Sequence, residues 1–379
     1  MKIMSIFGTR PEAIKMCPLI KELQKHPEIE NRVCLTGQHR EMLQSVMDIF
    51  GVHSDYNLDI MRTNQTLSTI TVDILEKIEN ILIQDRPDII LVHGDTTTSF
   101  VSALAAFYQQ IPVGHVEAGL RTHNKYSPYP EEMNRSLTGK IADIHFAPTV
   151  GNKLNLMQEN ITKNVFVTGN TVIDAFAFTL KNAYLFDCDA LNKIDYSTSK
   201  VILVTAHRRE NVGQPLLNIC EAITKIVSAF ENVVVIYPVH PNPVVRKTIF
   251  SQLSHVERVL LLDPLDVSDM HNLMARSYLV LTDSGGLQEE APACGIPVLV
   301  MRTETERPEA VEAGTVKVVG IQSDDIFEHA RVLLMDNGEY NKMAKAVNPY
   351  GDGTASLKIV QILLDWFANR LSVNDAESF

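Results

Sequence analysis

The sequence predicts an α/β protein built from two doubly wound, Rossmann-like domains with parallel sheets and an active site in the interdomain cleft. Short runs of β-branched and apolar residues alternate with longer helical patterns from end to end, which is typical of parallel sheets covered by helices on both faces. The chain has 379 residues, too many for one ordinary core and about right for two domains. A polar interval at 187–199 separates two series of such patterns.

The elements are expected in the following places. The expected strands of the first half are Lys2–Phe7, Arg32–Thr36, Asp88–His93, Val113–Glu117, Ile144–Ala147 and Val165–Thr168, with helical stretches such as Glu12–Gln24 and Leu67–Gln84 between them. Those of the second half are Val201–Thr205, Val233–Tyr237, Val259–Leu262, Leu279–Thr282, Val298–Val300 and Val316–Val318. We therefore assign residues 1–169 to the first domain and 170–353 to the second. A final helical pattern at about 354–371 is expected to pack back on the first domain.

Composition excludes several classes of protein. The net charge of −12 provides no general basic surface for nucleic acid or an anionic membrane. No apolar run reaches the ~18 residues of a membrane helix, and the short N-terminal run ends at Gly8, so a cytoplasmic protein is expected. The five cysteines lack the spacing of a metal site. Neither dinucleotide-binding nor P-loop glycine motifs occur, so no cofactor is expected.

Acidic residues gather where ligands bind parallel sheets, beyond the carboxyl ends of the strands. Asp95 and Glu117 each follow a strand directly, and Glu131 lies in a turn-rich stretch with Arg135 nearby. Burying a carboxylate without a purpose is costly, so these acids are candidates for chemistry. The neighbouring Glu132 is expected to be solvated.

The end of the first strand offers an anion site. Arg10 can bind a phosphate through two hydrogen bonds, Pro11 suits the first position of the following helix, and Lys15 lies about one turn further along. An arginine in an ordinary surface turn would give the same local pattern.

A second anion site is expected in the second domain. Ser284, Gly285 and Gly286 link a strand end to a helix start, where backbone N–H groups can surround a diphosphate. Glu290, about one turn into that helix, could accept hydrogen bonds from both hydroxyls of a ribose. A simple capped loop remains the alternative.

One histidine stands out. His207 follows the first strand of the second domain and is flanked by Arg208 and Arg209, so it could donate to a phosphate or exchange a proton near neutral pH. His240 and His271 lack such a setting and are expected to be structural.

In order along the chain, these segments resemble the non-hydrolysing UDP-N-acetylglucosamine 2-epimerase family, whose fold is that of the two-domain GT-B glycosyltransferases. The matching segments are FGTRPEAIKM (7–16), TGQHREML (36–43), VHGDT (92–96), HVEAGLRT (115–122), PEEMNR (130–135), VTGNTVID (167–174), HRREN (207–211), DSGGLQEE (283–290) and RTETERPE (302–309). They span essentially the whole chain.

The resemblance implies roles for these residues. It assigns Arg10, His207, Ser284, Gly285 and Gly286 to the diphosphate, Glu290 to the ribose, and Asp95, Glu117 and Glu131 to the sugar, with His207 also counted among the catalytic groups. Lys15, Arg135 and Arg307 match further substrate-binding positions. Gln38 and His39 match part of a second UDP-N-acetylglucosamine site that activates some members.

The implied reaction is the reversible epimerisation of UDP-N-acetylglucosamine to UDP-N-acetylmannosamine by anti elimination of UDP and re-addition to 2-acetamidoglucal. It would supply N-acetylmannosamine units for bacterial surface polysaccharide, in a homodimer without metal. The alternatives are a hydrolysing 2-epimerase, a GT-B glycosyltransferase that uses a UDP-sugar, and a nucleotide-sugar sensor without activity.

Overall fold

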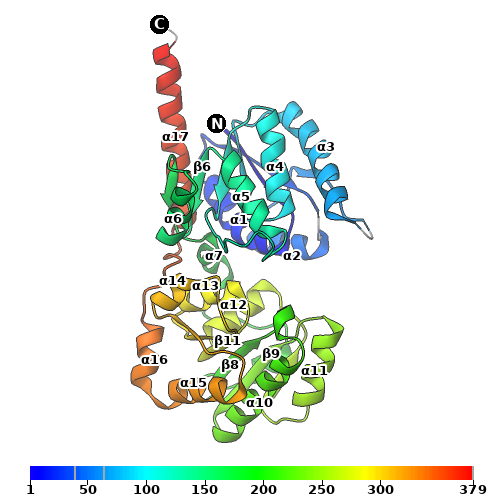
Figure 1. Cartoon of the computed structure of the whole chain (residues 1–379), viewed down its shortest axis with the longest axis vertical. Helices are drawn as coiled ribbons and strands as arrows, with labels where there is room; N and C mark the ends of the chain where they lie inside the picture. The colour runs from blue at the N-terminus through cyan, green and yellow to red at the C-terminus, as the bar shows by residue number, and fades with distance from the viewer. Residues whose placement is uncertain (38–39, 63–64, 378–379) are drawn as a thin grey trace. The chain divides into compact units, whose positions relative to one another are not determined.

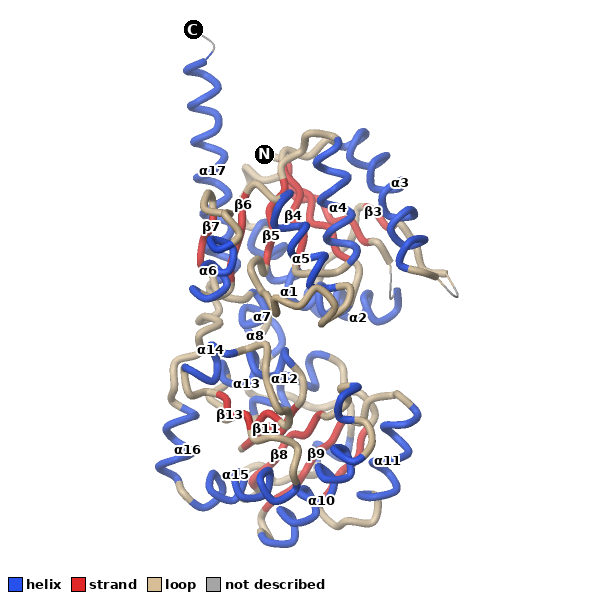
Figure 2. Tube along the Cα trace, viewed as in Figure 1, coloured by secondary structure: helices blue, strands red, loops and turns tan. Residues whose placement is uncertain are grey.

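The chain forms two compact units. The computed structural model describes residues 1–37, 40–62 and 65–377. One unit contains Met1–Phe178 together with Tyr350–Phe379, and the other contains Thr179–Pro349. In each unit, helices cover both faces of a parallel sheet (Figures 1 and 2). The predicted fold class, two doubly wound α/β domains, is confirmed.

The first sheet has the strand order β3-β2-β1-β4-β5-β6-β7 and is parallel throughout. Its strands are β1 (Lys2–Phe7), β2 (Glu30–Leu35), β3 (Tyr56–Asn57), β4 (Ile89–His93), β5 (Val113–Val116), β6 (Ile144–Ala147) and β7 (Val165–Val167). The helices of this unit are α1 (Arg10–Leu23), α2 (Arg40–Phe50), α3 (Leu67–Asp85), α4 (Thr97–Tyr108), α5 (Glu131–Ile141), α6 (Val150–Gln158), α7 (Thr171–Asp174), α8 (Phe176–Thr179) and α17 (Ala355–Glu377). Among the described strands of this sheet, only β3, two residues long, was not predicted from the sequence.

Helix α3 illustrates how the sequence directs these elements. Ile74, Ile78 and Leu82 recur every four residues and are fully buried in the core of the first unit. Thr66 caps the helix by accepting a hydrogen bond from the backbone N–H of Thr69. The opposite face of α3 is polar or exposed.

The second sheet has the order β10-β9-β8-β11-β12-β13 and is also parallel. Its strands are β8 (Lys200–Thr205), β9 (Val233–Pro238), β10 (Val259–Leu262), β11 (Leu279–Thr282), β12 (Val298–Val300) and β13 (Val316–Val318). The helices are α9 (Asp189–Asn192), α10 (Gln214–Ala229), α11 (Pro243–Leu253), α12 (Val267–Ala275), α13 (Gly285–Ala293), α14 (Pro308–Glu312), α15 (Ser323–Met335) and α16 (Asn337–Ala344), with a 3₁₀ turn at Arg209–Asn211. Counted within this unit the order is 3-2-1-4-5-6, the order of the dinucleotide-binding fold.

The first unit extends further along the chain than residue 169, where the sequence placed its end. Helix α7 packs on α1 and α17, and Asp174 accepts hydrogen bonds from the backbone N–H groups of Ala355 (3.2 Å) and Ser356 (2.7 Å). These contacts hold 170–178 in the first unit. They also join α17 to it.

The topology selects particular loops. In such sheets the strand order reverses between the first and fourth strands, and ligands bind beside the loops at that point. Here the loops are those after β1 and β4 in one unit and after β8 and β11 in the other. Among the described residues, no helix has the length and apolar character needed to cross a bilayer.

Candidate active site

Glu12, a buried carboxylate in the first turn of α1, ties the two loops of the first unit together. Its Oε2 accepts hydrogen bonds from the backbone N–H groups of Gly8 (3.0 Å) and Thr9 (2.8 Å), and its Oε1 accepts from Thr96 Oγ1 (2.6 Å). Burial raises the pKa of Glu12, and these donors oppose the shift. Thr96 also caps α4, so Glu12 fixes the β1–α1 loop against the loop that carries Asp95.

Asp95 follows β4 and is paired with α5. Its Oδ2 accepts a hydrogen bond from Arg135 Nη2, and Arg135 Nη1 lies 3.4 Å from Glu132 Oε2. Burial raises the pKa of Asp95; Arg135 opposes this shift, while the charges of Glu117 and Glu131 add to it. Glu117 and Glu131 therefore lie close enough to Asp95 for their charges to favour its protonated form.

Glu117 follows β5 and is held from several directions. Its φ of 62° lies in the left-handed region that non-glycine residues seldom adopt. Its Oε1 accepts hydrogen bonds from Lys15 Nζ and, at 2.9 Å, from Asn170 Nδ2, while its Oε2 lies 3.6 Å from His93 Nε2. Segments far apart in sequence thus converge on this carboxylate.

Glu131 and Glu132 open α5 in different environments. The prediction that Glu132 is solvated was wrong: it is 3% exposed and accepts hydrogen bonds from the backbone N–H groups of Thr122 (3.0 Å) and His123 (2.9 Å). The chain before α5 folds back over the first turn of that helix and supplies these donors. In contrast, Oε2 of Glu131 is buried and finds no hydrogen-bond partner in the described part of the chain. A proton or a substrate donor would satisfy it.

We call Asp95, Glu117, Glu131, Lys15 and Arg135 the acid cluster. Carboxyl groups placed next to one another are groups that can give and take protons in one reaction. Among the described residues, no group of three His, Cys, Asp or Glu side chains is arranged to hold a metal ion.

Asp283 organises the corresponding loops of the second unit. It is fully buried, and its Oδ2 accepts hydrogen bonds from the backbone N–H groups of His207 and Arg208, both at 2.8 Å, and from Asn211 Nδ2 at 2.9 Å. Its Oδ1 lies 3.7 Å from His207 Nδ1. Because Asp283 immediately follows β11, it anchors the β8 loop beside the start of α13.

Arginine side chains approach the start of α13. A Cβ atom at Gly285 would lie 3.6 Å from Arg307 Nη2 and 3.7 Å from Arg208 Nη2. Arg307 forms an ion pair with the buried Glu289, and Arg208 Nη1 lies 3.5 Å from Glu306 Oε1. Guanidinium groups beside the N–H groups of a helix start form a site for an anion such as a diphosphate.

The two histidines expected to be structural contact candidate residues. His271 Nε2 lies 3.4 Å from Glu290 Oε2. The ring of His240 stacks on that of His207, with centroids 4.9 Å apart and planes 9° from parallel. Burial lowers the pKa of His207, although Asp283 opposes the shift. His207 is therefore largely neutral at pH 7 and can both donate and accept a hydrogen bond.

The structure gathers the candidate residues into one group on each unit. The first group is the acid cluster; Arg10, the first residue of α1, is partly buried in the same unit. The second group contains His207, Ser284, Gly285, Gly286, Glu290 and Arg307. Gln38 and His39 lie outside the described residues.

Sequence reasoning missed several supporting side chains. His93 ends β4 and Asp283 follows β11, so the strand-end rule that selected Asp95 could have found both. Asn170 and Glu289 do not follow a strand directly, and no comparable signal in the sequence marks them. Their roles become visible only in the folded unit, where Asn170 contacts Glu117 and Glu289 contacts Arg307.

A cluster of acids on one doubly wound unit and arginines beside a helix start on the other are the groups that an enzyme acting on a nucleotide-linked substrate would need. The sequence model of the family described as UDP-N-acetylglucosamine 2-epimerase matches residues 21–364. The UDP-N-acetylglucosamine 2-epimerase of Bacillus subtilis is 53% identical over 377 residues, which cover 99% of this chain and 98% of the relative. The chain belongs to the UDP-N-acetylglucosamine 2-epimerase family and is an epimerase.

Solved structures agree with this assignment. The UDP-GlcNAc 2-epimerase from Neisseria meningitidis bound to UDP-GlcNAc is 50% identical, with a TM-score of 0.89 and coverage of 96% of this chain and 100% of that one. A structure of S. aureus MnaA with UDP is 48% identical, with a TM-score of 0.88 and coverage of 97% of both chains. The fold is accordingly GT-B-like, as the resemblance implied.

Proposed function

We propose that this epimerase interconverts UDP-N-acetylglucosamine and UDP-N-acetylmannosamine without hydrolysing them. The observation that carries the proposal is the acid cluster, in which Lys15 pairs with Glu117, Arg135 pairs with Asp95, and the charge of Glu131 acts on Asp95. Inverting C2 requires a proton to leave one face of the sugar and another to arrive on the opposite face, which favours more than one carboxyl group. The substrate bound to the Neisseria relative supports the choice of nucleotide sugar.

The proposed route is an anti elimination followed by re-addition. A carboxylate takes the proton from C2, the C2–H electron pair forms the C1–C2 double bond, and the C1–O bond breaks with its electrons leaving on UDP. The products of this step are 2-acetamidoglucal and UDP. A carboxyl group then protonates C2 from the other face while a UDP oxygen adds to C1. Electrons balance without an oxidant or a reductant.

The second unit would hold the nucleotide. His207, Arg307 and the backbone at Ser284–Gly286 would stabilise the charge that develops on the departing diphosphate, and Glu290 would accept hydrogen bonds from the ribose. The family resemblance assigns Arg10 to the diphosphate as well. The product would supply N-acetylmannosamine units for bacterial surface polysaccharide.

Exchange with solvent provides the direct test. Incubated with UDP-N-acetylglucosamine in deuterated water, the protein should form UDP-N-acetylmannosamine that carries deuterium at C2, because the returning proton comes from a carboxyl group in contact with solvent. NMR of the products, without added metal or nicotinamide cofactor, measures both the position of the label and the configuration at C2.

Other products would point elsewhere. Free N-acetylmannosamine with stoichiometric UDP would indicate a hydrolysing epimerase, and sugar transfer to an added acceptor would indicate a glycosyltransferase. Binding without turnover would indicate a sensor. Each of these results contradicts the proposal.

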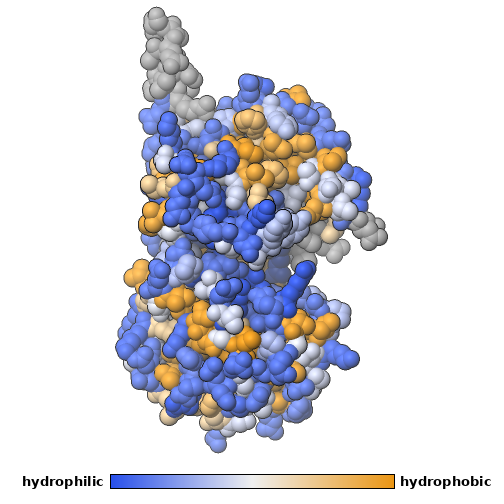
Figure 3. All heavy atoms as spheres, viewed as in Figure 1, coloured by the Kyte–Doolittle hydropathy of each residue, from blue (hydrophilic) through white to orange (hydrophobic). Residues whose placement is uncertain are grey.

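We also infer that the chain forms a homodimer through the exposed faces of α3 and α4. Figure 3 shows apolar side chains gathered over these two helices, which pack on each other. Val72 and Ile83 of α3 and Phe107 and Tyr108 of α4 are each more than half exposed. An apolar surface of this kind on a monomer is usually covered by a partner.

Substituting a charge into this surface should separate the subunits. Phe107 is 61% exposed, and Phe107→Asp is expected to shift the mass in solution, measured by light scattering, from dimer to monomer. Met335→Asp on α15, where the side chain is 65% exposed, is the matched control and should leave the mass unchanged. A Phe107→Asp protein with the wild-type dimer mass would exclude this face.

A further inference from the structure

His93, the last residue of β4, has a buried imidazole that the proposed reaction does not use. Its side chain is 5% exposed, and its Nε2 lies 3.6 Å from Glu117 Oε2. Nε2 has no hydrogen-bond partner among the residues that the structure describes. A buried polar atom without a partner is destabilising, so a residue kept in that state calls for an explanation.

We propose that His93 is a positioning residue for Glu117, donating a hydrogen bond from Nε2–H to Oε2 and so fixing the plane in which this carboxylate exchanges its proton. This inference rests on the proposed function of Glu117. A movement of about 0.5 Å would bring the two atoms to hydrogen-bond distance.

The surroundings of Glu117 explain why the histidine matters. Lys15 and Asn170 hold Oε1 of this carboxylate. His93 lies on the side of Oε2, where the adjacent Gly94 leaves space: a Cβ atom at Gly94 would lie 3.1 Å from Oε2. The charged and titratable groups around Glu117 include Lys15 from α1, His93 from β4 and Asp95 from the next loop, with Glu131 and Arg135 of α5 beyond Asp95.

The charge state of His93 suits this role. Burial lowers the pKa of His93 to about 4, and Lys15 acts in the same direction, while Glu117 opposes the shift. The imidazole is therefore neutral across the range in which enzymes of this kind work. A neutral donor orients the carboxylate without placing a second positive charge beside it, in addition to that of Lys15. Glu117 therefore remains able to take a proton.

Kinetics can distinguish positioning from simple packing. An N–H donor stabilises the charged form of Glu117, so its removal in His93→Leu should raise the pKa of that carboxyl group. The part of the pH profile in which kcat/KM rises with pH (the rising limb) should shift to higher pH by about one unit. We expect kcat to fall about tenfold with KM nearly unchanged, since the contact acts on the chemical step.

Two further variants complete the kinetic test. His93→Gln keeps an N–H donor near the position of Nε2 and should restore most of kcat and the wild-type limb. His145→Leu is the control, because it removes another buried imidazole, on β6, that is 2% exposed. Burial and then Arg121 lower the pKa of His145 to about 4, and no residue of the acid cluster contributes to this shift. This variant should leave the rising limb of the pH profile unchanged. An unmoved limb in His93→Leu, or one moved to lower pH, would overturn the proposal.

A spectroscopic readout keeps the inference separate from the proposed function. In protein labelled with ¹⁵N-histidine, the signals lost in His93→Leu should be those of a neutral ring protonated at Nε2 from pH 6 to 9, and they should shift in Glu117→Gln. This measurement needs no turnover, so it remains valid if the wild-type protein fails the exchange test. A ring protonated only at Nδ1, or signals indifferent to Glu117→Gln, would refute the role of His93.

Discussion

Replacing Asp95 by Asn, Glu117 by Gln or Glu131 by Gln is expected to lower kcat by about two to four orders of magnitude in each case. This is the usual scale for a group that transfers a proton in the transition state. Each substitution preserves the size of the side chain and removes its ability to exchange a proton. Turnover of UDP-N-acetylglucosamine, followed by NMR, measures the loss.

The three variants differ in what else they disturb. Asp95→Asn weakens the partner of the buried Arg135, and Glu117→Gln weakens the partner of Lys15, so both should also reduce thermal stability. Within residues 1–37, 40–62 and 65–377, Glu131 Oε2 has no hydrogen-bond partner. Glu131→Gln should therefore lose activity while its melting temperature stays near that of the wild type, which makes it the cleanest of the three.

Glu132 supplies the contrast. Its carboxylate accepts backbone hydrogen bonds and is buried, so Glu132→Gln should lower the melting temperature while changing kcat by less than about tenfold. Near-normal kcat in all three acid variants would remove the proposed proton-transfer roles. A collapse of kcat only in Glu132→Gln would move them to that residue.

Regular elements were accessible from sequence because buried parallel strands leave a local signal. Val298–Val300 is a short apolar run, and Val316–Val318 has two valines around a lysine; both are strands in the structure. Tyr56–Asn57 lacks such a run, and as a two-residue strand at the edge of the first sheet it has only one neighbour. The strand that the sequence missed is too short to show a run of apolar or β-branched residues.

The sequence could predict those site residues whose position follows from the order of the strands. Asp95 and Glu117 were selected because the carboxyl ends of adjacent strands must lie together. The burial and hydrogen-bond partners of each acid could not be predicted from the sequence. Glu132 looks solvated beside its neighbours in sequence, and its donors come from 122–123.

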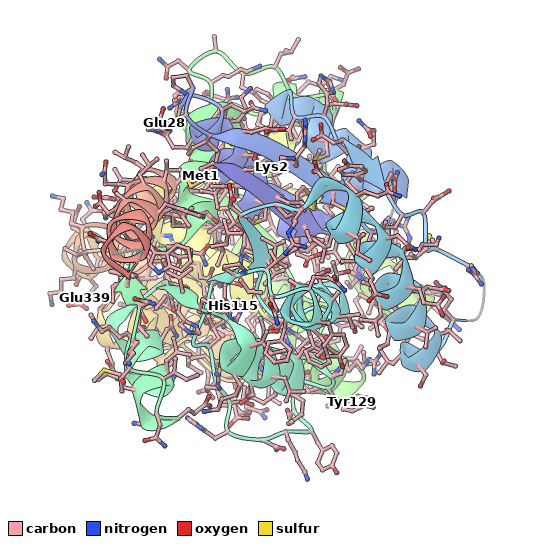
Figure 4. All side chains as sticks on the ribbon, turned by 90° about the horizontal axis from the view of Figure 1, so that it is seen from above. Met1, Lys2, Glu28, His115, Tyr129 and Glu339 are labelled. Carbon is pink, nitrogen blue, oxygen red and sulfur yellow. The ribbon has the colours of Figure 1, made fainter. Side chains whose placement is uncertain are left out.

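Contacts between residues far apart in the sequence could not be predicted from local sequence patterns. His115, seen inside the first unit in Figure 4, shows this as well: its Nε2 lies 2.7 Å from the carbonyl oxygen of Gly94, and burial lowers its pKa to about 3. The sequence shows a histidine within a strand. It does not show that the ring faces the loop bearing Asp95.

Replacing Asp283 by Ala should have the largest combined effect in the second unit. The variant leaves the backbone N–H groups of His207 and Arg208 and the amide of Asn211 without their shared acceptor in a fully buried site. Breaking a buried charged network of this kind costs about 3 kcal/mol of the free energy of unfolding. The loop that carries His207 should also lose its fixed position, and displacement of a binding group by about 1 Å can cost about a hundredfold.

Denaturant unfolding and calorimetric titration with UDP measure the two effects of Asp283→Ala separately. Asp283→Asn retains an oxygen acceptor and loses only the charge, so both of its effects should be smaller. Asp195 is the matched control, because it too accepts three hydrogen bonds, from the backbone N–H and Oγ of Ser197 and from Thr198 Oγ1, but in an exposed turn. Asp195→Ala should leave UDP binding unchanged, since solvent replaces the lost acceptor. If Asp283→Ala binds UDP as tightly as the wild type, the β8 loop does not depend on this carboxylate for its position, and the anion site must be held by the arginine contacts around Gly285 alone.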